Sequence, residues 1–210
     1  KALIVADWLI ITTNLNTKSE PMEHTIKKDV LALYKSHPFP RWNHGERQHR
    51  LSAELCRYRF LGLEDAMKDA RFLDIGCGKG GVIFLASDIF NNAIGVERNK
   101  KCYEVCLDNL KELKNCKIYN LDANDFNDYE NIDFVYMYNP FGNKTMKSVL
   151  DNINKSRINK PRDVLILYKN PIENDLLLEN GFVCISTHND HTREDNMVSK
   201  LYKKDYGNVS

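Results

Sequence analysis

The sequence has 210 residues, with 30 lysines and arginines against 29 aspartates and glutamates, which gives a net charge of +1. This length supports one well-packed core with a small addition, and excludes two full domains. The balanced charge argues against a strongly electrostatic nucleic-acid binder. The opening stretch ALIVADWLII is too short to cross a bilayer, so we expect no membrane association.

The six cysteines form no C-x-x-C pair. This pattern predicts reduced thiols in an intracellular, cytoplasmic protein. Two sulfurs on one predicted helix face, at Cys102 and Cys106, are too few ligands for a metal, so we expect no metal site.

Residues 1–70 are predicted to form a mostly helical N-terminal segment, a preface or lid for residues 71–210. Apolar residues recur there at helical spacing until Pro38, and Asn43 with Glu46 resembles a capping box that starts a second helix. Histidines gather in the same segment, at His37, His44 and His49.

From Arg71 onward, apolar strands alternate with amphipathic helices, which is typical of a parallel sheet covered on both faces. Helices are predicted from Gly81 to Ile89, at 99–113, at 144–155 and just before Gly181. Strands are predicted at 71–75, 93–97, 116–120, 132–138, 163–168, near 182–187 and near 197–202. The polar connection between the last two strands is too short for a parallel crossover, so these strands should pair as an antiparallel hairpin. The predicted fold of residues 71–210 is therefore α/β, a Rossmann-like doubly wound sheet of seven strands.

The stretch FLDIGCGKGG, residues 72–81, places four glycines directly after the first strand. Glycine accepts backbone angles closed to other residues and lets a ligand approach the main chain, so this loop predicts a nucleotide site. Gly76, Gly78 and Gly81 fit the dinucleotide pattern G-x-G-x-x-G, whereas Gly76, Gly78 and Gly80 fit the G-x-G-x-G loop of methyltransferases. The loop alone leaves both ligands open.

Ligands of an open parallel sheet bind at the carboxyl ends of its strands. Glu97 ends the second strand, where a carboxylate can accept two hydrogen bonds from a ribose diol, as both NAD and S-adenosylmethionine require. Asp122 follows the third strand, and Asn139-Pro140-Phe141-Gly142 follows the fourth. A methyl transfer to an amine needs an asparagine and an aromatic there, and a dehydrogenase has no particular need for them.

Residues 71 to about 205 resemble a class I S-adenosylmethionine-dependent methyltransferase, since FLDIGCGKGG, GVERN, NLDAND and YMYNPFG occur in the order and spacing of that family. The resemblance implies S-adenosyl-L-methionine as cofactor. It places the cofactor on Asp74, Gly76, Cys77, Gly78 and Gly80, with Glu97 on the ribose and Asp122 and Ala123 on the adenine. It makes Asn139, Pro140 and Phe141 the catalytic segment. Related enzymes that methylate planar nitrogens carry a second proline, and its absence weakens the case for a nucleobase or glutamine-amide acceptor.

The predicted function is methyl transfer to a nitrogen or oxygen of an unidentified acceptor, with a small molecule favoured. Alternatives are an N-methyltransferase acting on protein or nucleic acid, an NAD(P)-dependent oxidoreductase, and a non-catalytic nucleoside-binding scaffold. If the acceptor needs a base, the possible groups are Tyr136, Tyr138 and the three histidines of the N-terminal segment.

Overall fold

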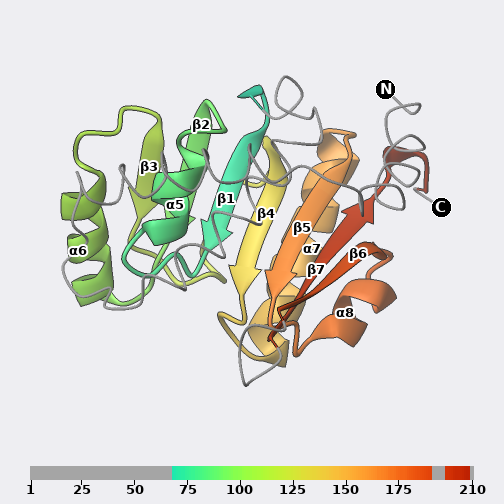
Figure 1. The fold of residues 1–210 in the computed structure, drawn as a ribbon. Helices are drawn as coiled ribbons and strands as arrows, with labels where there is room; N and C mark the ends of the chain where they lie inside the picture. The colour runs from blue at the N-terminus through green and yellow to red at the C-terminus, as the bar shows by residue number, and fades with distance from the viewer. Residues whose placement is uncertain (1–67, 191–196, 209–210) are drawn as a thin grey trace, which may run out of the picture. The chain divides into compact units, whose positions relative to one another are not determined.

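The computed structural model describes residues 68–190 and 197–208, which belong to a compact unit of residues 65–210 (Figure 1). The predicted helices of the N-terminal segment lie outside the described residues. So do the three histidines that were considered as bases. Those expectations therefore stay predictions.

The described residues form a seven-stranded sheet in the order β3-β2-β1-β4-β5-β7-β6 (Figure 1). The strands are β1 (Arg71–Ile75), β2 (Asn92–Val96), β3 (Cys116–Tyr119), β4 (Ile132–Tyr138), β5 (Val164–Lys169), β6 (Val183–Asp190) and β7 (Met197–Lys204). The helices are α5 (Gly81–Ala86), α6 (Lys100–Leu110), α7 (Asn143–Asn159), α8 (Asn174–Glu179) and the 3-10 turn η2 (Tyr206–Asn208). The first five strands are parallel, and β7 is antiparallel to both β5 and β6. The predicted fold class is confirmed.

Four elements end three or more residues from the predicted position. Helix α6 ends at Leu110 and not at residue 113, and helix α7 continues to Asn159, beyond the predicted end at residue 155. Strand β6 continues to Asp190, so His188 lies in a strand opposite Ser199 and not in the connection. Helix α5 ends at Ala86, although the apolar spacing predicted a helix as far as Ile89. The Ser87 hydroxyl donates to the Phe84 carbonyl at 2.6 Å, and this bond accompanies the end of the helix.

The two faces of the sheet are covered by different helices (Figure 1). One face carries Val135, Met137 and Ile166, which belong to a core cluster with side chains of α7 and α8. Asp74 and Tyr136 are register partners on β1 and β4 and lie on the opposite face, because side chains alternate along a strand. None of the described helices has the length and apolar character needed to cross a bilayer.

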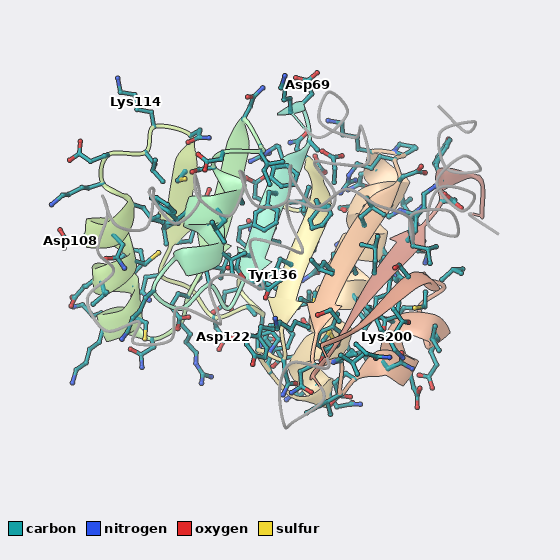
Figure 2. The ribbon with its side chains drawn as sticks, in the orientation of Figure 1. Asp69, Asp108, Lys114, Asp122, Tyr136 and Lys200 are labelled. Atoms are coloured by element: carbon teal, nitrogen blue, oxygen red, sulfur yellow. The ribbon has the colours of Figure 1, made fainter. Side chains whose placement is uncertain are left out.

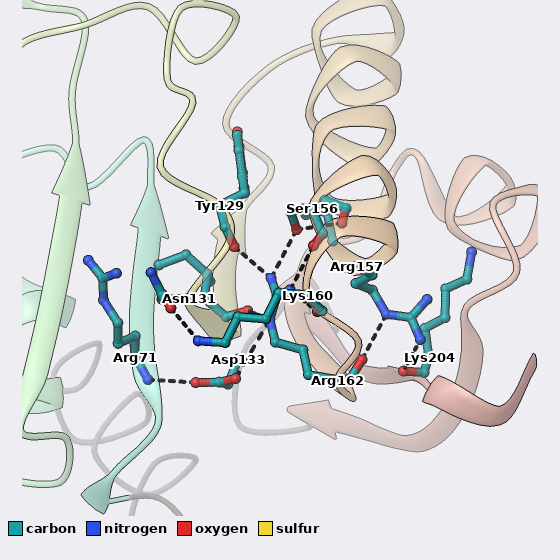
Figure 3. A network of polar contacts seen from close by, with 11 residues as sticks. Arg71, Tyr129, Asn131, Asp133, Ser156, Arg157, Lys160, Arg162 and Lys204 are labelled. Atoms are coloured by element: carbon teal, nitrogen blue, oxygen red, sulfur yellow. Dashed lines mark hydrogen bonds and ion pairs between the residues drawn. The ribbon is translucent and has the colours of Figure 1, made fainter. Parts of the chain in front are cut away.

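The amino ends of the parallel strands are joined by a polar network centred on Arg162 (Figure 3). Its guanidinium donates to the carbonyls of Ile132 and Tyr129 at 2.9 and 2.6 Å, and to the Ser156 hydroxyl at 2.9 Å. Asp133 accepts from the Arg71 backbone N–H at 3.0 Å and lies 3.7 Å from Arg162. These structural contacts occupy the amino ends of β1, β4 and β5, whereas the ligands of such sheets bind at the opposite, carboxyl edge.

Candidate functional site

The glycine loop after β1 is fixed to the end of β2. The backbone N–H groups of Gly76 and Cys77 both donate to the Val96 carbonyl, at 2.8 and 3.0 Å. Gly80 donates to the Cys77 carbonyl at 3.0 Å. The three glycines at 76, 78 and 80 have φ of 88°, 57° and 85°, in the left-handed region that favours glycine. The sequence therefore specifies the loop conformation through these glycines.

The three glycines share a left-handed backbone but differ in what a side chain at each position would contact. A Cβ on Gly76 would lie 2.6 Å from the Pro140 Cβ, so the loop and the segment after β4 are in van der Waals contact. A Cβ on Gly80 would lie 2.6 Å from the Cys106 Sγ, so this glycine lets α6 approach. A Cβ on Gly78 would meet no atom of the described residues within 4 Å. Among the described residues, the space beside Gly78 is therefore open to a ligand.

Asp74 lies on β1 just before this loop and is only 2% exposed. Its Oδ2 has no hydrogen-bond partner among the described residues. Burial, and to a smaller extent the charge of Glu97, raise the pKa of this carboxyl well above its ordinary value. A buried carboxylate oxygen without a donor is costly, and a bound cationic amine would satisfy it. The predicted contact of Asp74 with the cofactor is compatible with this unpaired oxygen and stays a prediction.

Glu97 follows β2 directly and connects the end of this strand to the glycine loop and to the start of α6. Its Oε2 accepts from the Gly78 backbone N–H at 2.9 Å, and its Oε1 accepts from the Asn99 backbone N–H at 2.6 Å. Each carboxylate oxygen has a second lone pair, so both can still accept from the hydroxyls of a ribose. The predicted ribose role is compatible with this geometry and stays a prediction.

Asp122 lies at the carboxyl edge of the sheet, at the end opposite to Lys114 (Figure 2). Its Oδ1 accepts from the Asn124 backbone N–H at 3.0 Å and from the Asn124 side chain at 2.7 Å. Its Oδ2 lies 3.4 Å from Arg98. The hydrogen bonds from Asn124, together with Arg98, lower the pKa of Asp122, so the carboxylate is ionised at neutral pH. The predicted hydrogen bond from the adenine amine to this carboxylate stays a prediction. Ala123 is half-buried against the core.

Asn139 starts the segment after β4 with a left-handed backbone, φ 39°. Pro140 and Phe141 are half-buried, and Phe141 packs on the core cluster. Tyr138, just before them, is 44% exposed, and the Lys169 Nζ lies 5.8 Å from the centroid of its ring. Tyr136, the other tyrosine considered as a base, is 2% exposed and lies beside Asp74 in the sheet.

Cys77 differs from the other predicted loop residues, because its side chain lies in the core and is 7% exposed. A Cβ on Gly95 of β2 would lie 2.8 Å from its sulfur, so the thiol packs between strand and helix. A hydrogen bond with Cys106, followed by burial, raises the pKa of the Cys77 thiol. Only the backbone of Cys77 could meet a cofactor. Within the described part of the chain, no group of three or more histidine, cysteine or acidic residues could hold a metal.

Two asparagines that support the site were not predicted. The Asn109 side chain donates to the Lys79 carbonyl at 2.9 Å and braces the glycine loop from α6. The Asn120 side chain donates to the carbonyls of Glu97 and Arg98 at 2.8 and 3.1 Å. A single asparagine on an amphipathic helix or after a strand carries no pattern that would have identified either role.

Several solved structures share this fold over most of the chain. A SAM-dependent methyltransferase from Leishmania major has a TM-score of 0.62 and 12% identity, covering 85% of this chain and 83% of that one. The N-methyltransferase NodS from Bradyrhizobium japonicum has a TM-score of 0.58 and 10% identity, covering 73% and 97%. The magnesium protoporphyrin IX methyltransferase from Synechocystis, solved with bound SAM, has a TM-score of 0.57 and 13% identity, covering 89% and 98%.

The strand order and the glycine loop beside the Asn139 segment define the fold of the class I S-adenosylmethionine-dependent methyltransferases, as the sequence resemblance predicted. The chain belongs to the family described as Conserved hypothetical protein 95, which matches residues 57–210. Among curated proteins, none matches the sequence.

Proposed function

We propose that the protein is a methyltransferase that uses S-adenosyl-L-methionine and transfers its methyl group to a nitrogen or oxygen of a small-molecule acceptor. The observation that carries this proposal is the close approach of Gly76 to Pro140, where a Cβ added to the glycine would lie 2.6 Å from the proline Cβ. It joins the cofactor loop to the segment that would hold the acceptor. Donor and acceptor sites are then immediate neighbours, as methyl transfer requires.

The residues present fit the cofactor. Asp74 offers a buried carboxylate oxygen without a described donor, Gly78 borders open space, and Glu97 keeps lone pairs for two hydroxyls. We therefore assign the methionine part to Asp74 and the glycine loop, the ribose to Glu97, and the adenine to Asp122 and Ala123. When bound, the cofactor supplies a methyl group on a sulfonium, which is already activated for displacement.

The contribution of the protein is then positioning. Asn139 would accept a hydrogen bond from the acceptor and hold its lone pair in line with the methyl carbon and the sulfur. The aromatic ring of Phe141, anchored on the core, would limit where the acceptor can lie. An amine that attacks in its neutral form needs no strong base before transfer, and the proton released afterwards can leave to water.

An NAD(P)-dependent oxidoreductase is less well supported. A dinucleotide-binding Rossmann sheet has the strand order 3-2-1-4-5-6, whereas here β7 is inserted antiparallel between β5 and β6. Gly81, the buried first residue of α5, fits the dinucleotide pattern as well, so the strand order is the observation that separates the two functions.

Isothermal titration calorimetry tests the proposal. We expect S-adenosylhomocysteine to bind with a dissociation constant on the order of micromolar, and NADH not to bind. Gly78→Arg should abolish binding by filling the space beside the loop. Lys111→Ala, an exposed residue at the C-terminal end of α6, should bind like the wild type. Binding of NADH without binding of the thioether would contradict the proposal.

A further inference from the structure

Two neighbouring strands of the sheet end in the same way. Strand β4 runs into Asn139-Pro140, and strand β5 runs into Asn170-Pro171. Asn139 and Asn170 have φ of 39° and 51° and are the only non-glycine residues with positive φ in the described part of the chain. A residue before proline favours extended backbone, so both positions hold an unfavourable conformation. Backbone strain of this kind gathers at functional sites.

The two Asn-Pro turns lie side by side. Tyr138 and Lys169, the residues just before them, are register partners across the parallel strands β4 and β5. The turns are also joined by a side-chain bond, because Asn143, at the start of α7, donates to the Glu173 carboxylate at 3.2 Å. The end of β5 is therefore the immediate neighbour of the segment assigned to the acceptor.

The backbone around Asn170 is held by hydrogen bonds, while its side chain is exposed. Its N–H donates to the Val198 carbonyl at 2.8 Å, and its carbonyl accepts from the Ile172 N–H at 2.9 Å. The side chain is exposed, and none of the hydrogen bonds found among the described residues uses its carboxamide. Tyr138, just before the first turn, and Ile172, within the second, are 44% and 67% exposed and add apolar surface to the two turns. A small-molecule site combines a few polar groups with apolar side chains, and the ends of β4 and β5 present both.

We infer that Asn170 is a second positioning residue for the acceptor, and that the acceptor is an amine with at least two N–H groups. The inference rests on the proposed methyltransferase function. The carboxamide oxygens of Asn139 and Asn170 can each accept one N–H, whereas a hydroxyl has a single hydrogen to donate. With both N–H groups held, the nitrogen lone pair has one direction left, toward the methyl carbon. The new N–C bond forms as the S–C bond breaks, the bonding pair stays on sulfur, and one proton leaves the nitrogen.

A pair of cofactor analogues tests this without knowledge of the natural acceptor. In both analogues, a nitrogen atom replaces the sulfonium sulfur of the cofactor. One analogue carries an aminoethyl arm, which places an amine where the acceptor would lie. The other carries a propyl arm of the same length, which has no polar group. The measured quantity is the ratio of their dissociation constants in each protein, which cancels any general loss of folding or cofactor affinity. The proteins are wild type, Asn170→Gly, Asn170→Asp and the matched control Asn127→Ala, an exposed asparagine in the segment between β3 and β4.

We expect the wild type to bind the aminoethyl analogue about 30-fold more tightly than the propyl analogue, the size of two hydrogen bonds of about fivefold each. Asn170→Gly, which suits a positive φ and removes only the carboxamide, should reduce this preference about fivefold and keep the part due to Asn139. Asn170→Asp, which keeps an acceptor oxygen and adds charge, should increase it, and Asn127→Ala should keep it.

Three results would overturn the inference while leaving the proposed function intact. These are an unchanged preference in Asn170→Gly, a preference in Asn170→Asp no greater than in Asn170→Gly, and equal binding of both analogues by the wild type. Binding of neither analogue by the wild type would instead refute the proposed function, on which the inference rests.

Discussion

One oxygen of the buried Asp74 carboxyl has no hydrogen-bond partner among the described residues, and its burial lowers the stability of the folded protein. Burial and the neighbouring Glu97 raise the pKa of its carboxyl in the folded protein. For an acid with a raised folded-state pKa, the stability it contributes is fully present below the unfolded-state pKa and is lost as the pH rises through the folded-state pKa. The wild type should therefore lose stability with rising pH in that window.

Asp74→Asn should remove this dependence. We expect the variant to equal the wild type in stability at low pH and to exceed it at neutral pH, measured by thermal unfolding across a pH series. Its affinity for S-adenosylhomocysteine should fall by about 10- to 100-fold, because a charge-assisted bond to the cofactor amino group is lost. A variant that is less stable at neutral pH and binds the thioether normally would show that Asp74 is a structural residue.

Gly76 and Gly78 offer a matched pair of alanine substitutions, since both have positive φ. Gly78→Ala should destabilise the protein by about 1–2 kcal/mol, the cost of a left-handed L-residue, and should weaken cofactor binding because its methyl enters the ligand space. Gly76→Ala should cost about 2–4 kcal/mol, because its methyl also collides with Pro140. Denaturant unfolding measures both. Equal destabilisation would contradict the role of the contact with Pro140.

The predictability of the site differs from residue to residue. The glycine pattern predicted the loop, because left-handed backbone requires glycine. It could not predict that Gly76 faces Pro140, since this contact joins residues 64 positions apart through the register of β1 and β4. Cys77 was grouped with the loop by its position, but its side chain lies in the core, and no sequence signal separated the two roles.

At the scale of elements, strand and helix periodicity predicted every strand and helix of the described unit except the short turn η2. The prediction differs from the structure in where some of these elements begin and end. Strand β6 is longer than predicted because His188, Asn189 and Asp190 look like a polar loop, yet they pair with β7 at the edge of the sheet, where polar residues are tolerated. Helix α5 is shorter than predicted. Ile89 is apolar and lies at helical spacing, so the pattern included it, but the helix ends at Ala86.

The element contacts at the amino edge depend on Arg162, whose side chain is 10% exposed. Arg162→Lys should destabilise the protein by about 2 kcal/mol, because an ammonium cannot reproduce the planar fork that reaches several acceptors at once. Guanidinium-induced unfolding measures the loss, and the affinity for S-adenosylhomocysteine should not change. Lys111→Ala, which removes an exposed pair with Asp108, should cost at most about 0.5 kcal/mol. Similar stabilities for the two variants would refute the structural role of the network.

At the scale of the whole described unit, the sheet has two edges, β3 and β6, and five internal strands. All side chains of β3 are at least partly exposed, in contrast to β4 and β5. In hydrogen–deuterium exchange we expect the amides of β7 to exchange about tenfold or more slowly than those of β3 and β6, because internal strands are paired on both sides. Exchange of β7 as fast as that of β6 would mean that the β7–β5 ladder opens independently.

The insertion of β7 between β5 and β6 also bears on how the chain is made. Synthesis proceeds from β5 to β6 before β7 exists, yet β6 joins the sheet only through β7. Until β7 leaves the ribosome, the apolar strand Val164–Lys169 is an unprotected edge, and such edges pair readily with other chains. The newborn protein is thus most vulnerable to aggregation just before its last described strand emerges, so translation speed over that short interval should influence the yield of folded protein.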